Sequence, residues 1–141
     1  MKNSEHINLD TQNLINYSVQ FAEVLLIEFK EFFPFAAAVN WKGEVIPITN
    51  YFGEEHPLSN SVIQYFESLL DQQLSNGEIR SYALAYDVRV SPNGIDEPTD
   101  AILVKIKHDI KIEPSIYYFA YRISGNNIIE RLNNWKEGNN S

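Results

Sequence analysis

The changes of apolar period along this chain constrain its fold more than any other feature. Apolar residues at spacings of three and four form a helical stripe over residues 11–33: Ile15, Val19, Ala22, Leu26, Phe29 and Phe33. Residues 59–76 repeat a helical pattern, and a short third helix is expected over residues 126–136. Strand-like patterns cover the segments between them, at residues 35–41, 44–49, 79–90, 101–108 and 115–123.

This order of elements, helix-strand-strand-helix-strand-strand-strand-helix, predicts one α+β domain. The three consecutive strands should form an antiparallel meander, and the earlier hairpin should join it in a five-stranded antiparallel sheet. A chain of 141 residues suits a single domain. We expect that domain over residues 11–135, after a flexible N-terminus at residues 1–10 and before a disordered tail at residues 136–141.

Local signals predict where these elements begin and end. Asp10 is the expected N-cap of the first helix, and Pro34 is expected to stop it. Three alanines at residues 36–38 predict a central strand on which a helix packs close to the backbone. Pro47 lacks an amide donor and therefore predicts an edge strand, while Gly77 suits the left-handed residue after the second helix.

Composition excludes several classes of function. The chain has no cysteine, which rules out disulfides, zinc-thiolate sites and thiol nucleophiles. Its net charge of −8 disfavours nucleic-acid binding and is compatible with a basic protein partner. No segment reads as a membrane span or a signal peptide, so a cytoplasmic protein is expected. No cofactor is predicted, because glycine-rich phosphate loops and metal-ligand motifs are lacking.

The order of elements resembles that of roadblock and profilin-like domains over most of the chain. The resemblance implies that the two terminal helices lie on one face of the sheet and the middle helix on the other. It also implies an interaction role, since roadblock-like domains commonly dimerise and act as scaffolds. Four short segments look like a group of small bacterial proteins of unknown function, from which no activity carries over: residues 53–57 (GEEHP), 77–80 (GEIR), 86–90 (YDVRV) and 100–102 (DAI).

Asp87 is the best single candidate for acid–base chemistry, because a carboxylate is unusual between apolar residues in mid-strand. The alternative is a cross-strand ion pair with Lys105, Lys107 or Arg122. Basic residues beside Tyr118 on a sheet face would suit single-stranded nucleic acid, although the net charge disfavours it. That hypothesis requires one continuous positive patch, made of Arg80, Arg89, Lys105, Lys107 and Arg122.

The loop at residues 50–58 holds the remaining candidates. Glu54, Glu55 and His56 carry the ligand types of a hard or borderline cation and could take part in hydrolysis. Neighbouring residues of an extended loop point apart, and such acids also cap the next helix, so no metal site is predicted. Tyr51 and Phe52 add aromatic surface beside the negative charge, which suits a basic partner.

Two functions from different classes remain open at this level. The leading hypothesis is a non-enzymatic interaction or scaffold protein that binds through Tyr51, Phe52, Glu54, Glu55 and Tyr118. It would form a homodimer through a sheet edge or the first helix, and an acidic immunity-type protein that neutralises a basic toxin is one concrete version. The alternative is a small-molecule-binding or hydrolytic domain that uses Asp87 with the loop that contains His56.

Overall fold

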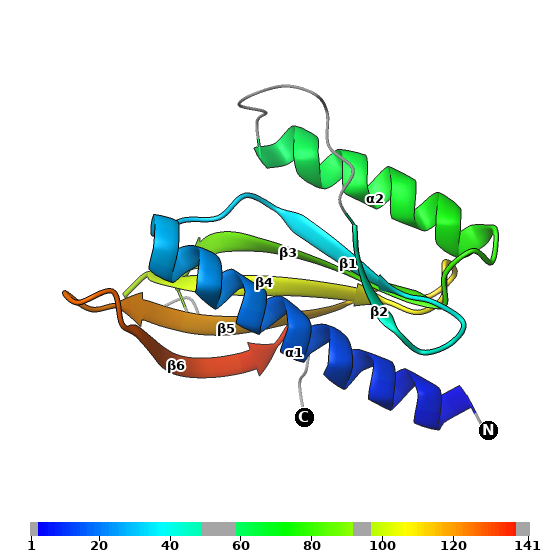
Figure 1. Cartoon of the computed structure of the whole chain (residues 1–141), viewed down its shortest axis with the longest axis horizontal. Coiled ribbons are helices and arrows are strands. Elements are labelled where there is room, and N and C mark those ends of the chain that lie inside the picture. Colours follow the sequence, from blue (N-terminus) through cyan, green and yellow to red (C-terminus); the bar gives the residue numbers. More distant parts are fainter. Residues whose placement is uncertain (1–2, 49–58, 92–96, 138–141) are drawn as a thin grey trace.

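The computed structural model describes residues 3–48, 59–91 and 97–137 of the chain. Its strands form one antiparallel sheet in the order β2-β1-β3-β4-β5-β6, with a helix against each face (Figure 1). In chain order the elements are α1 (Asn3–Phe29), β1 (Phe35–Val39), β2 (Val45–Ile48), α2 (Ser59–Ser75), β3 (Ser81–Val90), β4 (Thr99–Lys107), β5 (Ser115–Ile123) and β6 (Ile129–Lys136). The predicted α+β class with a single antiparallel sheet is confirmed.

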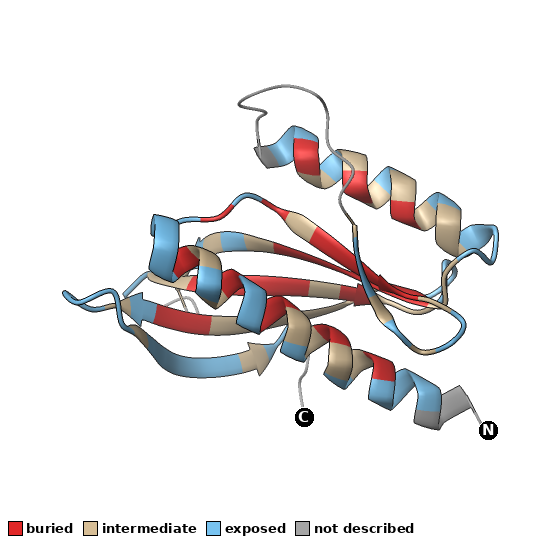
Figure 2. Cartoon of the chain, in the orientation of Figure 1, coloured by how far each residue is buried: buried red, intermediate tan, exposed pale blue. Residues whose placement is uncertain are grey.

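Alternating side chains of the central strands build two cores, one beneath each helix (Figure 2). Tyr82 and Leu84 of β3 pack with Leu70 of α2. Ala83 and Ala85 belong to the other core, beneath α1. Successive residues of a strand point to opposite faces of the sheet, so the alternation in the sequence predicts this division correctly.

The short strand β1 is buried on both faces. Its residues Ala36, Ala37 and Ala38 are each at most 2% exposed. Ala36 and Ala38 belong to the core beneath α2, and Ala37 belongs to the core beneath α1. The close approach of a helix is therefore confirmed, and the structure adds that a second helix covers the other side of the strand. Pro47 lies in β2 at the edge of the sheet, and Gly77 after α2 takes a left-handed φ of 76°, both as predicted.

The C-terminal segment is a strand rather than the expected helix. The Ser124 amide donates to the Ile128 carbonyl at 2.9 Å, and the Asn127 amide donates to the Ser124 carbonyl at 3.1 Å. Asn127 closes this tight turn with a left-handed φ of 61°, a conformation that asparagine tolerates better than most residues. The chain therefore returns directly along β5, and β6 becomes a sixth strand at the sheet edge.

An irregular pairing explains why this strand has a helix-like pattern. Phe119 and Tyr121 of β5 are two residues apart, whereas their partners Asn134 and Arg131 on β6 are three residues apart. Such a bulge breaks the period of two that marks a regular strand. The bulge accounts for the spacing of three between Leu132 and Trp135, while Ile128, four residues before Leu132, lies in the turn before β6.

Helix α1 begins at Asn3 rather than near residue 11, and it ends at Phe29 rather than at residue 33. Asp10 is consequently not an N-cap but a buried residue inside the helix. The helix ends where Lys30 takes a left-handed φ of 64°, before Pro34 acts on the chain. The predicted boundaries of this helix are therefore wrong at both ends.

The apolar stripe of α1 is correct in its middle and wrong at its end. Val19, Ala22 and Leu26 are buried against the sheet. Phe29 and Phe33 are 60% and 56% exposed, because the helix stops at the first of them and the second lies beyond it. Phe29 and Phe33 therefore lie outside the core, although their spacing in the sequence predicted that they would be buried.

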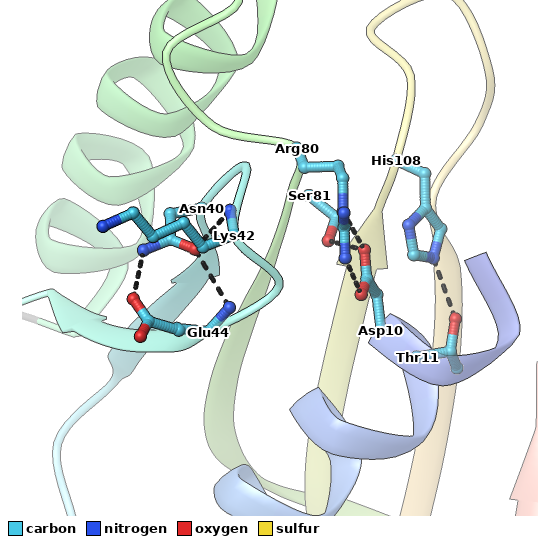
Figure 3. A network of polar contacts seen from close by, with 8 residues as sticks. All are labelled: Asp10, Thr11, Asn40, Lys42, Glu44, Arg80, Ser81 and His108. Atoms are coloured by element: carbon cyan, nitrogen blue, oxygen red, sulfur yellow. Dashed lines mark hydrogen bonds and ion pairs between the residues drawn. The ribbon is translucent and has the colours of Figure 1, made fainter. Parts of the chain in front are cut away.

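A buried ion pair joins the first half of α1 to the start of β3 (Figure 3). Arg80 donates to the two carboxylate oxygens of Asp10 from Nε and Nη2, each at 2.8 Å, and Ser81 Oγ lies 3.4 Å from the same carboxylate. The hydrogen bond to Asp10 raises the pKa of Arg80. Thr11 Oγ1 lies 2.8 Å from Nε2 of His108, a residue whose pKa burial lowers. These contacts attach the helix to both central strands.

We expect Leu26→Ala to lower the free energy of unfolding by about 2–5 kcal/mol, because it empties a fully buried position. Phe29→Ala on the same helix should lower it by less than about 1 kcal/mol, because the ring is largely exposed. Urea unfolding followed by circular dichroism measures both values. A larger loss for Phe29→Ala than for Leu26→Ala would contradict this description of the helix end.

Asp10→Ala should lower the free energy of unfolding by about 1–3 kcal/mol, because it leaves the partly buried Arg80 guanidinium without its partner. The double variant Asp10→Leu with Arg80→Met should recover part of that loss, since it removes both charges. Glu28→Ala removes an exposed carboxylate of the same helix and serves as the control. Equal stability of Asp10→Ala and the control in urea would show that the ion pair does not hold the helix.

Candidate functional site

Asp87 lies on the α1 side of β3, opposite Ile102 of β4. The Tyr121 hydroxyl donates to its Oδ1 at 2.8 Å. The predicted ion pair of Asp87 with Lys105, Lys107 or Arg122 is wrong. The two lysines point to the other face and pair with carboxylates of α2, and Arg122 pairs with a carboxylate of β6. Successive residues of a strand point to opposite faces, so Lys105 and Lys107 cannot lie on the same face as Ile102, the residue opposite Asp87.

Asp87 forms one wall of a cavity of about 590 Å³ beside the end of α1, which we call the phenylalanine groove. Its lining residues are Leu25, Phe29, Glu31, Phe32, Phe33 and Asp87. Phe32 is nearly buried, whereas the other two rings are open to solvent. The groove thus combines an apolar wall with two carboxylates, and no basic residue of the described chain lines it.

The environment of Asp87 raises the pKa of its carboxyl group. Although the residue as a whole is exposed, its carboxyl group is shielded from water, and this desolvation raises its pKa. The hydrogen bond from Tyr121 lowers the pKa and partly opposes that effect, while the negative charges of Asp100 and Glu31 raise it further. The carboxylate of Asp87 is therefore held among neighbours that disfavour its charge.

The polar groups that line the groove are two carboxyl groups. Glu31 is the second carboxylate, which the sequence analysis did not single out because it expected a helical residue there. The described lining residues include no serine, threonine, lysine or histidine, and their polar side chains are the carboxyl groups of Glu31 and Asp87. A carboxylate beside aromatic rings attracts a positive charge on an apolar body.

The loop candidates cannot be placed beside Asp87. Tyr51, Phe52, Glu54, Glu55 and His56 all lie outside the described residues. Their predicted roles in binding, hydrolysis and recognition of a basic partner stay predictions.

Tyr118 lies on the opposite face of the sheet from the groove, in a line of side chains that crosses four strands. The strand registers place these residues directly opposite one another in sequence across the sheet, and we call them the aromatic row: Tyr86, Leu103, Tyr118 and Trp135. Helix α2 packs mainly on β1 and β3, toward the other edge. Leu103 is buried by its neighbours, and the three aromatic residues are half-buried.

Tyr118 is held rigidly within the row. Its ring stacks on Trp135 with centroids 5.1 Å apart and an interplanar angle of 15°. Its hydroxyl donates to Glu137, and burial together with this hydrogen bond raises the pKa of Tyr118 to about 12. Sequence reasoning missed Trp135, because it assigned that residue to a helix. The alternating patterns of β3, β4 and β5 place Tyr86, Leu103 and Tyr118 on one face of the sheet, so these three members of the row could be found from the sequence.

The basic residues that could form a nucleic-acid surface are each paired with a carboxylate. Arg80 binds Asp10 on the α1 side of the sheet, and Arg89 binds Asp100 at 3.0 Å. Lys105, Lys107 and Arg122 are paired as described above. The continuous positive patch that this hypothesis requires is therefore not found in the described part of the chain.

The chain matches no family model, no curated protein and no solved structure. Within residues 3–48, 59–91 and 97–137, no helix is both long enough and apolar enough to cross a membrane. In the same residues, no three histidine, aspartate or glutamate side chains are grouped so that they could hold a metal ion.

Asp87→Asn should raise the free energy of unfolding near neutral pH. The fold raises the pKa of Asp87, so the stability contributed by this group is lost as the pH rises from the unfolded pKa through the folded pKa. Asparagine keeps an acceptor for the Tyr121 hydroxyl without the charge. Urea titrations at about pH 7 and about pH 4 measure the gain, which should shrink at the lower pH. A gain of equal size at both would contradict this explanation.

Proposed function

We propose that this protein is a non-enzymatic interaction domain and that the aromatic row is its contact surface. The observation that carries the proposal is the alignment of Tyr86, Leu103, Tyr118 and Trp135 across the sheet, from Tyr86 at the margin of the core beneath α2 to the edge strand β6. Tyrosine and tryptophan are enriched at protein interfaces, because each offers a rigid apolar body and a polar tip. The stacked pair Tyr118–Trp135 supplies such a surface already ordered.

The charge of the chain favours a basic partner. The net charge is −8, and Glu130 and Glu137 lie beside the row, in contact with Arg122 and Tyr118. A field of this sign accelerates encounter with a positively charged protein. An acidic immunity-type protein that acts in the cytoplasm is one concrete form of the proposal, and a scaffold is the other.

The homodimer that the sequence suggests is best placed on β6. The other edge strand, β2, is short and contains Pro47, which cannot donate to a neighbouring strand. Strand β6 has eight residues, no proline and one unpaired edge. Pairing of two β6 strands would continue the sheet from one copy into the next and bring their Trp135 side chains toward a shared surface.

Loss of the row should abolish partner binding without unfolding the protein. Tagged wild type, Tyr118→Ala and Trp135→Ala are incubated with extract of the native host, and the captured proteins are quantified by mass spectrometry. We expect a partner enriched by wild type to fall about tenfold or more with either variant, because truncation of a central aromatic anchor typically has such an effect.

Trp41→Ala is the matched control, since Trp41 is 63% exposed and lies in the turn between β1 and β2, away from the row. It should capture the same partner as wild type, and circular dichroism should show all variants folded. Capture of the same proteins in the same amounts by all four chains would refute the row as the contact surface.

A further inference from the structure

The phenylalanine groove contains two unfavourable features side by side. Phe29 and Phe33 expose more than half of their surface to water, although rings of this size contribute most to stability when they are covered. Asp87 of β3 lines the same groove, no basic residue of the described chain lines it, and the charges of Asp100 and Glu31 that act on Asp87 are both negative. A ligand that brings an apolar body and a positive charge would relieve both features at once.

We propose that the groove binds a small organic cation whose ammonium group lies against Asp87 and whose apolar body lies against Phe29, Phe32 and Phe33. Aromatic faces attract cations through their quadrupole, and a nearby carboxylate supplies the full countercharge. Glu31 adds a second negative charge to the same wall. This charge pattern excludes anions and distinguishes a cation from a neutral compound of the same shape.

The size of the groove sets the class of ligand. Its volume of about 590 Å³ falls within the range of small-molecule sites, roughly 300–1,000 Å³. Six residues line it, from the end of α1, the segment after it and β3. The expected ligand is therefore a single amine or quaternary ammonium compound with an aromatic or branched alkyl group.

This inference does not depend on the proposed interaction function. The groove lies on the α1 face of the sheet, and the aromatic row lies on the other face. Asp87→Asn leaves the row unchanged, and Tyr118→Ala leaves the groove unchanged. The two proposals can therefore fail separately.

The test uses the full chain, labelled with ¹⁵N, and benzyltrimethylammonium as the probe. Two-dimensional NMR should show saturable shifts of amides around Phe29, Phe33 and Asp87. Benzyl alcohol, which has the ring without the charge, should bind about tenfold more weakly or worse. Benzenesulfonate, which has the opposite charge, should cause no saturable shift.

Two variants and one control identify the groups responsible. Asp87→Asn removes the charge and should weaken binding of the probe about tenfold, and Phe29→Ala should weaken it severalfold. Glu113→Gln changes the net charge equally in the loop between β4 and β5, at the far end of the sheet from Asp87, and should leave the affinity unchanged. Absence of saturable binding, equal affinity for benzyl alcohol, or an equal effect of Asp87→Asn and Glu113→Gln would each overturn the proposal.

Discussion

The buried ion pair between Asp10 and Arg80 determines how α1 lies on the sheet. Burying two charges is unfavourable unless they form well-aligned hydrogen bonds. The two hydrogen bonds from Arg80 to Asp10, each at 2.8 Å, form only when the helix lies at the right place on the sheet. A second pair acts about 20 Å further along the helix, where Glu23 accepts two hydrogen bonds from Arg131 of β6 at 2.7 and 2.8 Å. Together with the buried apolar residues of α1, these contacts join the helix to the start of β3 and to β6, and the end of the helix lies beside Asp87.

Most of the fold could be predicted from the sequence, because most of it follows local rules. Alternation identified β3, β4 and β5, three alanines indicated an inner strand with a helix packed close to it, and Gly77 and Pro47 marked a helix end and a sheet edge. Each of these signals acts on the chain through its own backbone or its nearest neighbours. Side-chain patterns of this kind are therefore visible before any long-range contact is known.

The errors arose where a distant residue or an irregular pairing decides the structure. Asp10 has the chemistry of an N-cap, and only the position of Arg80, 70 residues away, shows that it is buried within the helix instead. The last strand contains a bulge, and a bulge replaces the period of two by spacings that belong to a helix. The fold family suggested by the order of elements depended on that last helix, and the chain has a sixth strand in its place.

The candidate sites show the same division. Asp87 and Tyr118 were identified as unusual strand residues, which is a local property. The residues around them were not identified. The lining of the groove depends on where α1 ends, and the stacking of Tyr118 on Trp135 depends on the register of β6, which was predicted as a helix. The cross-strand partners expected for Asp87 failed because Lys105 and Lys107 alternate with Ile102 along β4 and so point to the opposite face, where they pair with carboxylates of α2.

Strand β3 presents consecutive residues, Tyr86 and Asp87, to opposite sides of the sheet. The backbone between them is a single peptide unit, held by hydrogen bonds to β4. A ligand bound in the groove beside Asp87 therefore leaves Tyr86 and the aromatic row open, so a ligand and a protein partner can be bound at the same time. Any cooperativity between the two occupants would have to be transmitted through a small shift of that strand, and would be equal in both directions by thermodynamic reciprocity.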